Sequence, residues 1–215
     1  MSTETVAAKK SEALFSKRRK AIVTDPLDDD NPVTVQVLGI CSALAVTSKL
    51  EPTLVMSIAV TFVVIFSNLI VSLLRNAIPQ RIRIIVQLGI VASLVIIVDQ
   101  VLKAYLYDVS KVVGVYVGLI ITNCIVMGRL EAFAMANKPY DSILDGLGSS
   151  FGYAWVILIV AFFRELLGSG TLFDIRVLPE AYVNNGLMTS PVGAFIIIGL
   201  IIWVQRWRNG YVEEA

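Results

Sequence analysis

The chain contains no histidine and only two cysteines, Cys41 and Cys124, among its 215 residues. Without histidine it cannot form a bis-histidine haem site, a Rieske centre, a serine–histidine catalytic triad or an imidazole proton relay. The two thiols are therefore its only strong ligands for iron, copper or zinc, and they are half of what a cysteine-ligated iron–sulfur cluster requires. For either cysteine alone, a small apolar side chain in the core is the commoner role.

Charge is also scarce, because charged residues make up 16% of the chain and hydrophobic residues 56%, which is typical of membrane proteins. The net charge of +1 and the lack of a clustered basic face argue against nucleic acid as a partner. Neither a P-loop nor a GxGxxG pattern is present to hold a nucleotide. Lysine and arginine gather in the first twenty residues, and no apolar run follows them. Residues 1–32 are therefore predicted to be a polar cytoplasmic tail and not a cleavable signal.

Six apolar segments predict an all-α polytopic membrane protein, with six transmembrane helices over residues 33–208 and a short tail at 209–215. The first segment has only fifteen residues and spans about 22 Å, which is less than a hydrocarbon core of about 30 Å. The fourth is little longer, and each of these two short segments contains one cysteine. Both are expected to be short or broken helices. The segments cover about residues 33–47, 53–74, 84–98, 112–128, 150–167 and 187–205.

Short, interrupted segments at corresponding places in two halves are typical of inverted repeats with a site near the midplane of the membrane. The halves, at about 33–104 and 112–208, share a faint pattern in which each cysteine is followed by a basic residue, leucine and glutamate. Three helices per half turn the second half over, so Cys41 and Cys124 are expected to face each other near the midplane. Asn123 is a candidate donor of a hydrogen bond to the sulfur of Cys124.

The remaining polar residues near the membrane are interpreted as interfacial anchors or helix caps because most lie close to segment ends. They are Asn68, Gln87, Asp99, Arg164 and Glu165. Residues 141–148 are interpreted as the capped start of the fifth helix. Of the 18 lysines and arginines, 13 fall in the N-terminal tail, near the C-terminus at 206–208 and in the loops on the same side of the predicted membrane, and 5 fall on the other side. This asymmetry predicts that both termini are cytoplasmic.

Several runs resemble the NqrD/RnfE family of integral membrane subunits. The most specific is Ile121-Thr122-Asn123-Cys124-Ile125-Val126-Met127-Gly128-Arg129. The resemblance covers about residues 31–208 and also rests on the runs at 37–47, 83–87, 104–108 and 163–170. Family members belong to the Na⁺-translocating NADH:quinone oxidoreductase and to the Rnf complex. The run at 92–100 favours the former.

The resemblance implies a six-helix, multi-pass subunit of the bacterial inner membrane within a six-subunit complex, paired with a homologous NqrE-like subunit in inverted orientation. It implies that Cys41 and Cys124 supply half the ligands of an intramembrane 2Fe–2S cluster shared with that partner. Electrons from NADH would pass through FAD and a soluble 2Fe–2S cluster to this centre, then through FMN and riboflavin to ubiquinone, coupled to Na⁺ translocation. NADH, FAD, FMN and riboflavin are expected on other subunits, and no catalytic residue is expected in this chain.

Three alternatives remain open at this point: a subunit of the Rnf ferredoxin:NAD oxidoreductase, an inverted-repeat secondary transporter, and a membrane anchor with incidental cysteines. A transporter is expected to carry carboxylates at clear mid-span depth, and the apolar segments contain none there. An anchor has no reason to place its only two cysteines in its two short segments.

Overall fold

The computed structural model describes residues 22–27, 30–105, 114, 116, 118–173, 175–176 and 185–208. Residues 1–21 and 209–215 of the predicted tails, and part of the fourth apolar segment, lie outside these ranges. The regular secondary structure of the described residues is helical apart from one antiparallel pair of two-residue strands. Its elements in chain order are η1 (Asp25–Leu27), α2 (Ile40–Val46), α3 (Leu50–Leu74), α4 (Arg83–Tyr105), α6 (Cys124–Arg129), η2 (Leu130–Ala134, a π-helix), α7 (Pro139–Gly168), β1 (Thr171–Leu172), β2 (Ile175–Arg176), α8 (Gly186–Thr189) and α9 (Pro191–Arg208).

Four described helices, α3, α4, α7 and α9, are long and apolar enough to cross a membrane. They confirm the membrane helices predicted from the second, third, fifth and sixth apolar segments. The two segments that contain the cysteines form only short helices in the described chain: α2 has seven residues and α6 has six. The six-helix inverted repeat is not established by these elements and stays a prediction.

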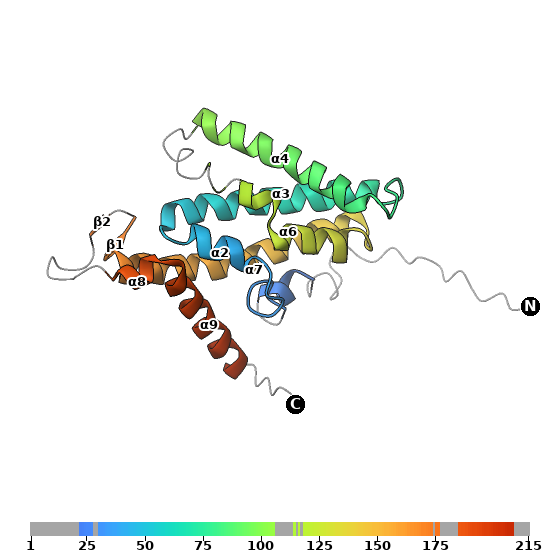
Figure 1. The fold of residues 1–215 in the computed structure, drawn as a ribbon. Coiled ribbons are helices and arrows are strands. Elements are labelled where there is room, and N and C mark those ends of the chain that lie inside the picture. Colours follow the sequence, from blue (N-terminus) through green and yellow to red (C-terminus); the bar gives the residue numbers. More distant parts are fainter. Residues whose placement is uncertain are drawn as a thin grey trace, which may run out of the picture.

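The centre of the molecule is a pair of antiparallel helices, α3 and α7 (Figure 1). The first residue of α3 lies at the end of α7, because Leu50 N donates to Glu165 Oε2 at 2.6 Å. Near the other end of α3, Asn68 Nδ2 donates to the carbonyl oxygen of Ser142 at 3.1 Å. The start of α3 thus lies beside the end of α7, and the end of α3 lies beside the start of α7. The two helices therefore run in opposite directions.

The segment before α2 packs on the side of α7. A Cβ atom added to Gly152 would lie 2.2 Å from the carbonyl oxygen of Pro26, so only glycine allows this approach. Asn31 Nδ2 donates to the carbonyl oxygen of Gly152 at 3.1 Å and fixes the contact. Residues 22–27 and 30–32, which the sequence assigns to the tail, therefore lie against the helical bundle; the boundary at residue 33 stays a prediction.

The start of α7 differs from the prediction. The helix begins at Pro139, and its N-cap residue, Lys138, makes no capping hydrogen bond through its side chain. Residues 141–148 therefore lie inside the helix and do not form a capped entry. Proline suits the first helical position because its fixed φ is already helical and its missing N–H has no intrahelical partner to lose.

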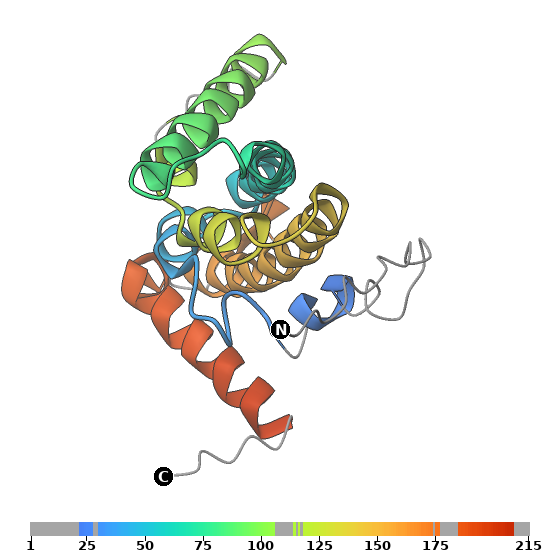
Figure 2. The same cartoon turned by 90° about the vertical axis from the view of Figure 1, so that its right-hand side faces the viewer.

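Helices α4 and α9 lie at the periphery and diverge from the central pair (Figures 1 and 2). In α4 only Gln87, Val91 and Val95 are buried. Both helices expose large apolar side chains over most of their length. Apolar faces of this extent need a bilayer or a partner protein to cover them.

Candidate functional site

Both cysteines occupy the first turn of a short helix. Cys41 is the second residue of α2, and Cys124 is the first residue of α6. Both are free and exposed at the surface of this chain. Their neighbours Ser42 and Asn123 are buried, with 2% and 4% of their surfaces exposed. Each thiol is therefore exposed at the surface, while the residue next to it in the sequence is buried in the interior.

The buried neighbours join the two cysteine segments through a polar network. Asn123 Nδ2 donates to Ser42 Oγ at 3.2 Å, and Ser42 Oγ lies 2.7 Å from the hydroxyl oxygen of Tyr153 in α7. Asn123 Oδ1 accepts from Ile125 N at 3.3 Å and so caps α6. Segments 81 residues apart in sequence are thus held together one residue from each cysteine. The observed partners of Asn123 are Ser42 and Ile125; its hydrogen bond to the sulfur of Cys124 stays a prediction.

Gly39, the N-cap of α2, makes this approach possible. Its φ is +82°, in the left-handed region that favours glycine. A Cβ atom at this position would lie 3.0 Å from Cε2 of Tyr153 and 3.5 Å from Oδ1 of Asn123. The start of α2 is therefore seated directly on the tyrosine ring and on the segment that leads into α6.

The network lies halfway along a candidate membrane helix. Tyr153 is the fifteenth of the thirty residues of α7 and is completely buried. A thirty-residue helix is about 45 Å long, which exceeds a hydrocarbon core of about 30 Å on both sides. The helix therefore extends beyond the hydrocarbon core, and its apolar run covers residues 150–167.

A second cluster fixes the far end of α2. Arg164 in α7 is 2% exposed, and its Nη1 donates to Thr47 Oγ1 at 2.7 Å and to the carbonyl oxygen of Leu44 at 3.3 Å. Its other nitrogens donate to the carbonyl oxygens of Met188, Thr189 and Ser190. The interpretation of Arg164 as an interfacial anchor is therefore wrong, because the guanidinium ties α2 and α8 to α7. Glu165 is indeed a cap, for the start of α3.

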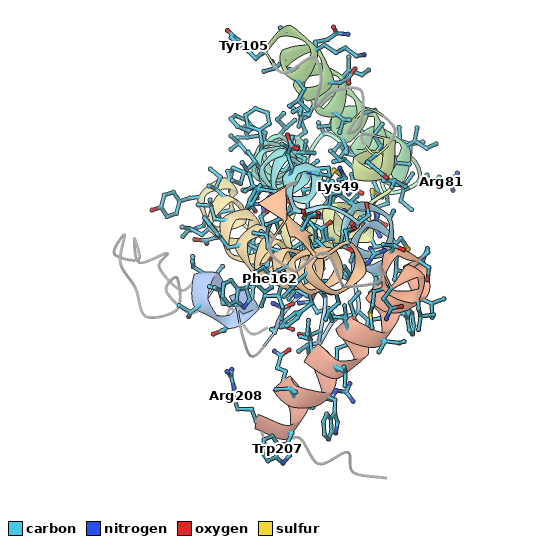
Figure 3. The ribbon with its side chains drawn as sticks, turned by 90° about the vertical axis from the view of Figure 1, so that its left-hand side faces the viewer. Lys49, Arg81, Tyr105, Phe162, Trp207 and Arg208 are labelled. Atoms are coloured by element: carbon cyan, nitrogen blue, oxygen red, sulfur yellow. The ribbon has the colours of Figure 1, made fainter. Side chains whose placement is uncertain are left out.

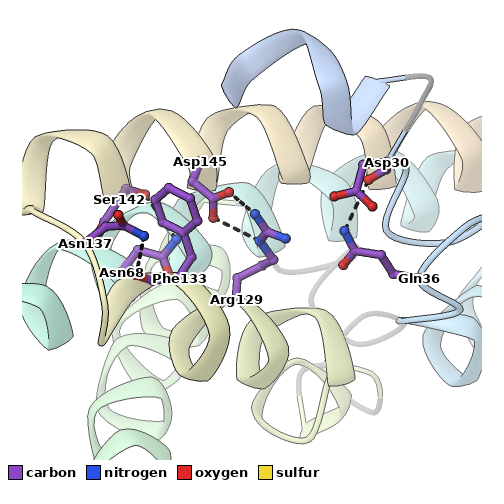
Figure 4. A network of polar contacts seen from close by, with 8 residues as sticks. All are labelled: Asp30, Gln36, Asn68, Arg129, Phe133, Asn137, Ser142 and Asp145. Atoms are coloured by element: carbon purple, nitrogen blue, oxygen red, sulfur yellow. Dashed lines mark hydrogen bonds and ion pairs between the residues drawn. The ribbon is translucent and has the colours of Figure 1, made fainter. Parts of the chain in front are cut away.

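An ion pair holds α6 to α7 (Figure 4). Arg129 Nε donates to Asp145 Oδ2 at 2.9 Å, and Nη2 contacts the other carboxylate oxygen. The guanidinium also lies over the ring of Phe133, with Cζ 5.6 Å from the ring centroid. Asp145 is 1% exposed, so this buried ion pair fixes the last residue of α6, at the end opposite Cys124, to α7.

The other predicted polar residues have ordinary partners. Gln87 Nε2 donates to Glu131 Oε2 at 3.2 Å, and Glu131 also pairs with Arg83. Asp99 pairs with Lys103 one turn later in α4 at 2.5 Å. These contacts link α4 to η2 or stabilise α4 itself, and none of them lies beside a cysteine in the sequence.

The donor set fits a soft metal centre only in part. In the described chain no three His, Cys, Asp or Glu side chains gather where they could hold one metal ion. The thiols are exposed and lie in segments held together, which suits iron–sulfur ligation from one side. Two thiolates leave the remaining positions to another chain, and the outward exposure of both cysteines leaves room for one.

Sequence reasoning singled out the cysteines but missed Ser42 and Tyr153. A signal for the tyrosine exists, since it shares one helical face with Ser142, Gly146 and Ser149 in an otherwise apolar helix. A polar stripe of this kind inside a membrane helix is unusual and indicates buried partners. No comparable pattern in the sequence marks Ser42.

Comparison with known proteins bears on the same residues. A family model described as "Rnf-Nqr subunit, membrane protein" matches residues 19–202. The D-type subunit of the Na(+)-translocating NADH-quinone reductase of Photobacterium profundum is 58% identical to this chain over 196 residues, covering 89% of this chain and 93% of that relative. Both matches span α2, α6 and the polar network between them.

Proposed function

Because the chain belongs to the Rnf-Nqr family of membrane protein subunits, we propose that it fills, in a Na⁺-translocating NADH-quinone reductase, the place for which its 58%-identical relative is named. In this proposal Cys41 and Cys124 supply two thiolate ligands to an intramembrane 2Fe–2S centre. A homologous inverted subunit supplies the other two. When bound, such a centre supplies a one-electron carrier at mid-membrane depth.

The observation that carries the proposal is the hydrogen bond between Ser42 and Asn123. It ties together the residues adjacent to the chain's only two cysteines, which an incidental pair of thiols does not require. The hydrogen-bonded network of Ser42, Asn123 and Tyr153 then holds the two cysteine segments in fixed positions. Anchored neighbours reduce the freedom of the ligands, and such outer contacts commonly orient metal ligands.

The antiparallel course of α3 and α7 supports the inverted repeat. Each follows a short cysteine-bearing helix in the chain, so α2–α3 and α6–α7 correspond in order. An axis in the membrane plane would relate the two pairs, and both thiols would lie near it. We place the subunit in the bacterial inner membrane with cytoplasmic termini, on the strength of the charge asymmetry.

The test is replacement of each cysteine by serine in the complete complex. Cys41→Ser and Cys124→Ser should each remove the intramembrane iron and abolish quinone reduction, while NADH still reduces the peripheral flavin. Ala45→Ser is the matched control, since it adds a hydroxyl to the same short helix outside the first turn. Normal iron content and turnover in the double variant would contradict the proposal.

Sharing of the cluster has its own test. We expect the subunit expressed alone, and shown to be monomeric, to hold no stoichiometric iron–sulfur cluster, because two thiolates leave half of the ligand positions unfilled. A stoichiometric cluster in the monomer would refute the shared site but leave the cysteine assignment intact. A subunit of the Rnf complex remains the second candidate, since the family covers both complexes; assay of NADH–quinone against ferredoxin–NAD activity separates them.

A further inference from the structure

An apolar groove of about 780 Å³ runs between α7 and α9. On α7 it is lined by Trp155, Ile159 and Phe163, and on α9 by Leu200, Val204 and Arg208. The residues on each helix are spaced by four, so each set forms one stripe along its helix. The volume and the largely apolar lining with a few polar groups fall within the range of ligand pockets, although the groove is open along one side.

The groove exists because α9 is packed only at its start. Its buried residues are Gly193, Ala194, Ile197 and Ile198, and Met188 of α8 closes this end against Gly193. From residue 199 onward α9 buries none of its residues and stands away from α7. Side chains in the groove are left uncovered: Trp155 is 62%, Leu200 54% and Val204 52% exposed.

The groove has the length of one membrane leaflet. From Ile196 to Arg208 the stripe on α9 rises about 18 Å, against about 15 Å for half of a 30 Å hydrocarbon core. Trp203 and Trp207 on α9 are 68% and 81% exposed, and tryptophan in membrane helices concentrates at the headgroup level. Figure 3 shows Trp207 and Arg208 at the end of α9 that stands away from the bundle, with their side chains on different sides.

The open end of the groove is polar. Arg208, Gln205 and Asn31 line it there, while the closed end at Met188 and Leu167 is apolar. A guanidinium at the headgroup level is suited to a phosphate, which it can contact through two N–H groups. The arrangement, apolar along one leaflet and cationic at its edge, matches the shape and charge of a phospholipid.

We propose that this groove binds one phospholipid, with an acyl chain between α7 and α9 and the phosphate at the Arg208 end. A transmembrane helix of a partner subunit is the competing occupant, but an apolar helix offers no anionic group to Arg208 at the end of the groove.

Lipid tails are as apolar as the lining, so burial of the chain alone gives no preference for the groove over bulk lipid. Retention must therefore depend on a filled shape and on the phosphate contact. Leu200→Trp should fill the groove, and Arg208→Gln should remove the contact. Val192→Trp and Arg206→Gln are the matched controls, since both positions are on α9 and neither lines the groove.

The experiment is native mass spectrometry of the purified complex after detergent washing. The complex with unaltered sequence and both controls should retain one phospholipid that Leu200→Trp lacks, and Arg208→Gln should lose it several-fold faster during washing. If Leu200→Trp fails to assemble, Arg208→Gln alone decides. Equal retention in Arg208→Gln and Arg206→Gln, or recovery of a quinone instead of a phospholipid, would overturn the proposal. Iron content, measured on the same samples, keeps this outcome separate from the cysteine site.

Two further arms sharpen the assignment. Complexes reconstituted with phosphatidylethanolamine alone or phosphatidylglycerol alone, then re-extracted, show which headgroup is retained; retention of either supports the site, because the phosphate is common to both. The N-terminal segment carries Asp25 and Asp30 near the groove residues Leu27 and Asn31, and a bound ethanolamine headgroup would suit such carboxylates. Retention of neither lipid, or a disulfide from Leu200→Cys to a cysteine in another subunit, would refute the site.

Discussion

Gly39 is the residue at which backbone and packing constraints on the cysteine site meet. With φ at +82°, an alanine here would cost about 1–2 kcal/mol in backbone strain, and its methyl group would lie 3.0 Å from the Tyr153 ring. Gly39→Ala should therefore lower the thermal unfolding temperature of the complex and reduce its intramembrane iron. Both are measured on purified complex by a thermal shift and by iron analysis.

Gly89→Ala is the matched control. Gly89 lies inside α4 with no atom within 4 Å of the added methyl group. Alanine is about 1 kcal/mol better than glycine in a helix interior, so this variant should be as stable as the original or more so, with normal iron. Equal behaviour of the two variants would show that α2 does not depend on its contact with Tyr153.

At the residue scale, the sequence identifies the candidate metal ligands but not the residues that hold them in position. Cys41 and Cys124 are recognisable because soft ligand chemistry is a property of the residue itself. The partnership of Ser42 with Tyr153 joins positions 111 residues apart, and no local pattern encodes it. The same holds for Arg164, whose acceptors include Leu44 and Thr47. The place of Arg164 near a segment end suggested an interfacial anchor. In the fold, backbone carbonyl oxygens accept hydrogen bonds from its guanidinium, so that the side chain can be buried.

Among the elements, hydropathy predicted the long helices well and the first segment poorly. The apolar run from Val33 to Leu38 is not helical. Asn31 Oδ1 accepts from the backbone N–H groups of Val33 and Thr34, and Val37 has a φ of +59°, which breaks a helix. Hydropathy measures transfer from water and carries no information on backbone angles. Hydropathy also missed the first turns of α7, because residues 139–149 are more polar although five of them are buried.

At the scale of elements, we expect the hydrogen bonds of Arg164 to hold α2 in its position. Arg164→Met leaves its acceptors without a donor, and each unsatisfied buried group costs about 1–3 kcal/mol. Arg164→Lys keeps the charge but cannot reach acceptors on both α2 and α8 with a planar fork. Both variants should loosen α2 and raise the rate at which Cys41 reacts with a maleimide several-fold, measured with Cys124→Ser as background.

Arg81→Met serves as the control for lost charge, because Arg81 is exposed in the turn between α3 and α4. It should leave the reaction rate of Cys41 unchanged. A rate in Arg164→Met equal to that in Arg81→Met would mean that α2 is held by the Tyr153 network alone.

For the whole molecule, both ends of the described chain lie toward the end of the central bundle at which α7 begins. The N-terminal segment contacts Gly148 and Gly152, in the first half of α7. Helix α9 starts beside the end of α7, where Gly168 meets Thr189. It then runs obliquely away from α7 and back toward the side on which α7 begins (Figure 1).

The arginines support a cytoplasmic assignment for that side. Arg75 donates to the carbonyl oxygen of Asn137, just before α7, so the turn with Arg81 and Arg83 lies on this side too. The opposite side loses a charge from the count made on sequence, because Arg164 is buried inside α7. The charge asymmetry that predicts the orientation is kept without Arg164, and the orientation stays a prediction from the rule that positively charged loops remain in the cytoplasm.

The orientation is tested with single cysteines in a Cys41→Ser/Cys124→Ser background, one in the N-terminal tail and one at Gly210. A membrane-impermeant maleimide applied from the periplasmic side should label neither until the membrane is permeabilised, because both tails are predicted to be cytoplasmic. Glu51→Cys, exposed at the start of α3, reports on the other side and should be labelled without permeabilisation. Labelling of both tails from the periplasm would invert the topology. Labelling of only one tail would mean an odd number of crossings and end the six-helix hypothesis.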